Sequence, residues 1–175
     1  MKRLFEIALL ASSLVVGCGG DDATAPDEIG SAEEALAPTP MSPTAIEAGG
    51  PNLRFVGGLT VTNGSQTFTM NPGGTYSLPC AFGPARITHR YGNGGALGAG
   101  NHANQFRAGA FVLAPKAQLP LASGFSRMVT DSFNFLQLAP NVPHTMGVRL
   151  DVLGQVVETS ELDNALAVTV RRVCP

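Results

Sequence analysis

A chain of 175 residues is long enough for one domain of ordinary size with its own core, and too short for two large ones. Charged residues make up only 14% of it, against about 25% in average soluble domains, and the net charge of -2 argues against a dedicated nucleic-acid binder. The 21 Gly and 13 Pro exclude a coiled coil. A polytopic membrane protein is excluded because the sequence contains only one apolar run.

The first 17 residues have the features of an export signal. Two basic residues precede an apolar stretch at positions 4–16, which is too short to span a bilayer because spanning needs about 20 residues. The stretch ends in Val-Val-Gly before Cys18 and resembles a bacterial lipobox, which implies cleavage before Cys18 and lipidation of its thiol. Gly19, in place of an Asp, favours the outer membrane of the bacterial cell envelope. The alternative is an ordinary secretory signal that contains a cysteine.

Residues 18–51 are predicted to form a disordered linker after the lipidated Cys18. The stretch is rich in Pro, contains seven acidic residues and has no Lys or Arg. Residues 52–175 then hold nine basic and five acidic residues, a net charge of +4. We interpret this as a solubilising tether attached to a mildly basic domain. The alternative is that the domain binds anionic lipid, polysaccharide or its own tether.

From residue 52 onward, apolar residues alternate with polar ones, which is typical of β-strands. Asn63-Gly64 predicts a hairpin turn, and Pro79 indicates that its strand lies at a sheet edge. A parity switch after Phe135 indicates a bulge. The pattern predicts an antiparallel β-sandwich of about seven strands over residues 52–175. The strand segments lie at 53–62, 66–70, 76–82, 85–91, 106–113, 146–152 and 166–170.

The C-terminal part carries a family resemblance. A strand that ends at Asp151 is followed by an acidic corner and then by an alternating last strand at 165–170. The segments 87–95 and 136–143 look like an earlier strand with its Asn-x-Gly turn and the turn before the penultimate strand. This pattern resembles the CARDB family, the cell-adhesion-related Ig-like domains, over roughly residues 85–170. The resemblance implies an Ig-like fold and extracellular modular use, not a reaction. The corner contains Glu158, Glu161, Asp163 and Asn164, with Asp163 where the family usually has Asn.

The corner has two chemical interpretations. Its four acid and amide side chains are a weak candidate site for Ca²⁺, which takes six to eight oxygen ligands. Asp and Asn in tight turns more often cap local backbone N–H groups, and we prefer this interpretation. The sequence predicts no other metal site and no cofactor.

The cysteines form one candidate pair. If Cys18 is lipidated, Cys80 and Cys174 remain, and each shares the parity of apolar neighbours. Because export permits disulfides, we predict a Cys80–Cys174 bond. The alternative is two free buried thiols.

The histidines have no metal-ligand spacing. We expect His89 to be a hydrogen-bonded core or edge residue, and His102 to lie in a flexible turn next to the Gly-rich stretch 92–100. The sequence contains no Gly-x-Ser-x-Gly, His-Glu-x-x-His or Cys-x-x-Cys motif. We therefore predict a non-enzymatic, lipid-anchored envelope protein whose sandwich binds or spaces surface components such as protein or polysaccharide. The alternative is an exported hydrolase or an accessory subunit of an envelope enzyme.

Overall fold

The structure is a computed structural model that describes residues 38–40 and 49–175, so the export signal and Cys18 lie outside the described residues. No helix in these two ranges is long and apolar enough to cross a bilayer. The described elements are β1 (Thr39–Pro40), β2 (Leu53–Thr62), β3 (Thr67–Met70), β4 (Thr75–Pro79), β5 (Pro84–Asn93), β6 (His102–Ala108), β7 (Phe111–Val112), β8 (Lys116–Gln118), β9 (Phe125–Asn134), the 3₁₀ turn η2 (Phe135–Gln137), β10 (His144–Arg149) and β11 (Ala165–Val173).

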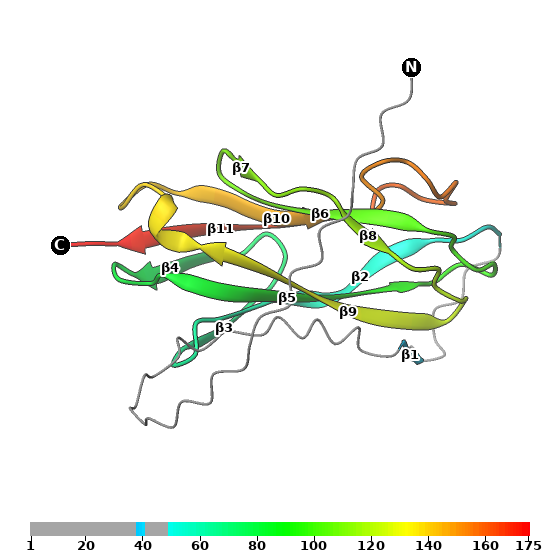
Figure 1. Ribbon diagram of the computed structural model, residues 1–175, viewed down its shortest axis with the longest axis horizontal. Helices are drawn as coiled ribbons and strands as arrows, with labels where there is room; N and C mark the ends of the chain where they lie inside the picture. The colour runs from blue at the N-terminus through cyan, green and yellow to red at the C-terminus, as the bar shows by residue number, and fades with distance from the viewer. Residues whose placement is uncertain (1–37, 41–48) are drawn as a thin grey trace, which may run out of the picture. The chain divides into compact units, whose positions relative to one another are not determined.

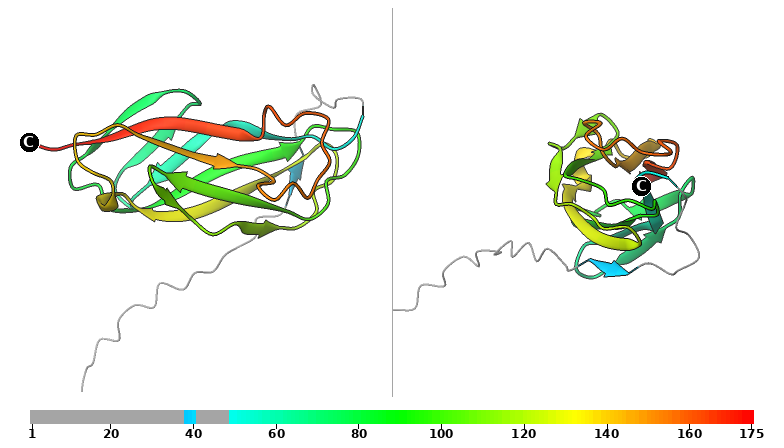
Figure 2. Two further views of the ribbon diagram at one scale, coloured as in Figure 1. Left: turned by 90° about the horizontal axis from the view of Figure 1, so that it is seen from above. Right: turned by 90° about the vertical axis from the view of Figure 1, so that its right-hand side faces the viewer.

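The strands form two sheets that face each other (Figure 1). The first sheet has the order β1-β9-β5-β2-β3, and the second has the order β4-β11-β10-β6-β7, with β8 also paired to β6. The end-on view in Figure 2 shows the two sheets around a common interior. The predicted all-β sandwich is confirmed, and the predicted hairpin at 63–64 joins β2 to β3. The strands outnumber the predicted seven partly because β1, β7 and β8 are only two or three residues long.

Alternation along the strands produces the core. In β5, Ala85, Ile87, His89 and Tyr91 are buried, whereas the residues between them are half-buried or exposed. Inward side chains from both sheets form two apolar clusters, and the smaller cluster surrounds Tyr91. Each fully buried large apolar side chain contributes about 1.5–3 kcal/mol, so these clusters supply much of the force that holds the sheets together.

Two local predictions are wrong. The run at 106–113 is not one strand: β6 ends at Ala108, and Gly109 turns the chain with a φ of 57°, which favours glycine. The parity switch after Phe135 is the turn η2 and not a bulge. The side chain of Asn134 caps this turn by accepting a hydrogen bond from the backbone N–H of Leu136, and such a cap favours a tight turn over continued strand.

Strand pairing departs from the prediction at two edges. The chain crosses from the first sheet to the second after β3, and β4 then runs parallel to β11, although the other paired strands described here are antiparallel. Pro79 lies in this edge strand, as predicted. Thr39 and Pro40, which the sequence placed in the linker, form β1 and pair with Ser126 and Phe125 of β9.

Candidate functional site

The acidic corner lies in the connection between β10 and β11 and holds the start of β2. The Glu158 carboxylate accepts hydrogen bonds from the backbone N–H of Leu53 and from Asn164 Nδ2, the latter at 2.9 Å. Asn164 Nδ2 also donates to Glu161 Oε2 at 2.9 Å. The side chains predicted from the sequence are therefore brought together, and they join two parts of the chain that are about a hundred residues apart.

Two further acids of the connection accept hydrogen bonds. Asp163 Oδ2 accepts from Asn52 Nδ2 at 3.4 Å. Asp151 has a φ of 40°, and its carboxylate accepts from the backbone N–H groups of Gln155 at 2.9 Å and Val156 at 2.7 Å. Within residues 38–40 and 49–175, no group of three or more His, Cys, Asp or Glu residues is placed to hold a metal ion. Asp151 therefore caps local backbone N–H groups, whereas Glu158, Asp163 and Asn164 of the corner contact other side chains and the distant N–H of Leu53.

The Glu158 carboxyl has a shifted pKa. The pKa of Glu158 is raised to about 7, and burial is the largest cause. The hydrogen bonds from Leu53 and Asn164 act in the opposite direction and lower this pKa. The charges of Glu161 and Asp151 raise this pKa further. The Glu158 side chain therefore changes its protonation near neutral pH, whereas an exposed Glu would be fully ionised there.

A buried asparagine joins the loops at this end of the sandwich. Asn93 Oδ1 accepts from the backbone N–H groups of Asn52 and Gly95, both at 3.0 Å. Its Nδ2 donates to the carbonyls of Leu97 at 2.7 Å and Leu121 at 3.1 Å. One side chain thus holds the start of β2 and the loops after β5 and β8. The sequence placed Asn93 in a turn but gave no sign of these distant partners.

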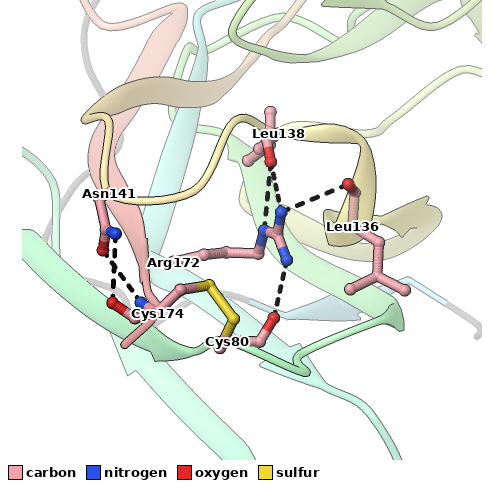
Figure 3. The surroundings of a disulfide bond; sticks show 6 residues. All are labelled: Cys80, Leu136, Leu138, Asn141, Arg172 and Cys174. Atoms are coloured by element: carbon pink, nitrogen blue, oxygen red, sulfur yellow. Dashed lines mark hydrogen bonds between the residues drawn. A yellow bond between two sulfur atoms is a disulfide. The ribbon is translucent and has the colours of Figure 1, made fainter.

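Cys80 and Cys174 form a disulfide at the opposite end of the strands, with their Cα atoms 4.6 Å apart (Figure 3). This confirms the predicted pair, and the alternative of two free thiols is wrong. Beside the disulfide, Arg172 is 7% exposed and donates to backbone carbonyls only. Its Nη1 donates to Cys80 at 2.7 Å, while Nε and Nη2 donate to Leu138 at 3.2 and 2.7 Å, and Nη2 reaches Leu136 at 3.4 Å.

A second polar contact closes the same end of the molecule. Asn141, in the left-handed region at a φ of 60°, accepts at Oδ1 from the Cys174 N–H at 2.9 Å and donates from Nδ2 to the Cys174 carbonyl at 3.2 Å. Arg172 was not among the predicted site residues, although it shares the inward parity of Val168 and Val170. A charged residue on the apolar parity of a strand is the signal that indicates a buried cation with a set of oxygen partners.

The histidine region lies between the sheets, in the smaller part of the core. His102 begins β6 and is 1% exposed, so its predicted place in a flexible turn is wrong. Its Nε2 lies 2.8 Å from the Tyr91 hydroxyl, and its Nδ1 lies 2.9 Å from the Gly100 carbonyl. Burial lowers the pKa of His102 and raises the pKa of Tyr91 to about 12. Both groups are therefore held neutral near pH 7.

His89 is a core residue, as predicted, but it is not hydrogen-bonded. Its ring is 1% exposed and lies 5.9 Å from the Phe55 ring and 6.3 Å from the Tyr91 ring, measured between centroids. Within the described residues, neither ring nitrogen has a hydrogen-bond partner. Burial lowers the pKa of His89 to about 4, and the charge of Lys116 lowers it further. An uncharged imidazole is therefore fixed in the core across the physiological pH range.

Comparison with known proteins gives a match in structure alone. No protein-family model matches the chain, and no curated protein sequence matches it. The fold is similar to a crystal structure of the CARDB domain of a Pyrococcus furiosus protein in complex with di-metal ions. That match has 14% identity and a TM-score of 0.48, and it covers 75% of this chain and 95% of that chain.

The solution NMR structure of the same archaeal domain gives the same identity and TM-score, with 70% of this chain and 95% of that chain covered. At this identity the likeness concerns the fold alone.

Proposed function

We propose that this chain is a lipid-anchored protein of the bacterial cell envelope whose β-sandwich binds or spaces surface components without catalysing a reaction. The observation that carries this proposal is that the polar clusters of the described residues form structural contacts. Glu158 and Asp163 hold the start of β2, and Arg172 is surrounded by carbonyl oxygens. The partners of His102 are a tyrosine hydroxyl and a backbone carbonyl, whereas a catalytic base is usually oriented by a carboxylate.

The anchor is tested by replacing Cys18 with Ala and fractionating the cells. We expect the wild-type chain in the membrane fraction and the C18A variant in the soluble fraction, because the variant lacks the thiol that takes the lipid. Ser12→Ala is the matched control, since it changes the apolar segment by one atom and leaves the lipobox intact. If C18A partitions with the membrane as the wild type does, Cys18 is not the anchor.

One observation favours the second candidate, an exported hydrolase. A carboxyl with a pKa of about 7 beside another acid is an arrangement found in general acid catalysts, and Glu158 with Glu161 has both features. The test is turnover of envelope polysaccharides and peptides by the purified chain and by Glu158→Gln. Turnover that is lost in E158Q but kept in Glu161→Gln would support the hydrolase. Absence of turnover in the wild type would leave Glu158 with its structural role.

A further inference from the structure

The outer face of the first sheet carries a row of hydroxyl groups across four strands. In the observed register, Thr69 of β3 lies opposite Thr60 of β2, Thr60 lies opposite Thr88 of β5, and Thr88 lies opposite Thr130 of β9. We call these four residues the threonine row. Neighbouring strands are about 4.8 Å apart, so the row presents hydroxyls at a regular spacing. Thr88 and Thr130 are linked by a hydrogen bond of 3.0 Å between their Oγ1 atoms, which orders this part of the row.

Two arginines flank the threonine row on the central strand. Arg86 and Arg90 lie two residues before and after Thr88 on β5, which places their Cα atoms roughly 13 Å apart on the same face. Arg86 is exposed and Arg90 is half-buried. Within residues 38–40 and 49–175, neither guanidinium is engaged in a hydrogen bond or ion pair. Both are therefore available to an external anion, which an arginine can hold with two parallel hydrogen bonds.

Acidic residues are segregated away from this face. Of the five acids in residues 52–175, four lie in the connection between β10 and β11. The fifth, Asp131, is on β9 but pairs with the buried Ile87 and so has the inward parity. The described outer positions of the sheet therefore combine positive charge and hydroxyls with no carboxylate. This is complementary to a ligand that carries both anionic groups and hydroxyls.

The side chains on the face also limit the class of ligand. Phe55 and Phe68 of these strands pack against the core, and Phe125, which is 38% exposed, has the inward parity of Val129, so no aromatic ring lies at the outer positions to stack on a neutral sugar. Met128 lies opposite Arg90, and Val56 of β2 is 38% exposed, which is too little apolar surface to insert into a bilayer. A charged, hydroxyl-rich strip favours an extended anionic polymer over a lipid surface.

We propose that the threonine row, with Arg86 and Arg90, binds an acidic polysaccharide. Carboxylate groups of the polymer pair with the two guanidinium groups, and sugar hydroxyls exchange hydrogen bonds with the threonine Oγ1 atoms. This inference rests on the proposed function, because it names the surface component that an envelope-anchored sandwich would hold. Since the attraction is between exposed charges, binding weakens as salt is added.

The test measures binding of polygalacturonate to the full chain in detergent, with neutral dextran as a comparison. We expect the double variant Arg86→Gln/Arg90→Gln to weaken binding at least ten-fold. The matched control is Arg107→Gln/Arg149→Gln, which removes the same charge from exposed outward positions of the second sheet and should change binding less than two-fold. Thr60→Val, which keeps the shape and removes one hydroxyl of the row, should weaken binding several-fold.

Three outcomes would overturn the inference. Equal weakening by the two double variants would mean that net charge alone attracts the polymer. Binding to phosphatidylglycerol vesicles but not to polygalacturonate would assign the face to lipid. Tighter binding of a peptide of residues 19–37 than of the polymer would assign the face to the acidic tether. The proposed function is tested separately by fractionation of the C18A variant, so a chain that is anchored but does not bind the polymer refutes only this inference.

Discussion

Replacing the buried imidazole of His89 should make the domain less sensitive to acid. The pKa of this side chain falls from 6.5, its ordinary value, to about 4 in the folded state, mainly because of burial. Between these two pH values the unfolded chain binds more protons at this position than the folded chain does. The free energy of unfolding therefore decreases as the pH falls from 6.5 to 4.

The size of the effect follows from the shift. One pKa unit corresponds to about 1.36 kcal/mol, so His89 should cost the folded state about 3 kcal/mol between pH 7 and pH 4. In His89→Leu this contribution is absent, and a side chain of similar volume occupies the space beside Phe55 and Tyr91. The variant also removes two buried nitrogens that lack partners, which should raise stability at pH 7 by about 1 kcal/mol.

The assay is urea unfolding followed by circular dichroism at pH 7, 5.5 and 4. We expect the wild type to lose about 3 kcal/mol more than His89→Leu over this range. Some acid sensitivity should remain in the variant, because the pKa of His102 is also lowered by burial. The half-buried His144, changed to Leu, is the control. Equal losses in the wild type and in H89L would refute the reasoning.

Three other changes have expected outcomes that are measurable by the same unfolding assay. The double variant Cys80→Ser/Cys174→Ser should lose about 4 kcal/mol, because the bond closes a loop with a sequence separation of 94, and a loss below about 1 kcal/mol would contradict this estimate. The raised pKa of Glu158 should lower the free energy of unfolding as the pH rises from 4.5 to 7, opposite to the effect of His89, so Glu158→Gln should gain more stability over this range than the wild type does. Arg172→Met should cost about 2–4 kcal/mol by leaving its carbonyl partners unpaired, and Arg172→Lys should restore part of this.

Features that depend on one strand were predictable from the sequence. The alternation along β5 predicted which residues are buried, and the parity of Cys80 and Cys174 predicted the disulfide. Pro79 indicated an edge strand because proline has no backbone N–H to donate to a neighbouring strand. Each of these conclusions needs only the period of two and the chemistry of one side chain.

Features that depend on which strands are neighbours were not predictable. The alternation along the strand gave the outward parity of Thr88. The threonine row also requires that Thr60 and Thr130 lie opposite Thr88 on the neighbouring strands, and this register is set by tertiary packing. The parallel pairing of β4 and the partners of Asn93 depend in the same way on contacts between distant segments. The buried place of His102 was missed because the glycines before it suggested a flexible turn.

The disulfide that joins β4 to the last strand at one end of the sandwich has a consequence for resistance to proteases. The connection between β10 and β11 presents Val157 and Leu162, which are 90% and 96% exposed, and it is therefore a ready site for proteolytic cleavage. This connection lies inside the segment enclosed by Cys80 and Cys174. A single cut there would leave the last strand bonded to the rest of the chain through its sulfur atoms. The nicked domain would lose a loop connection while both fragments stayed in one molecule.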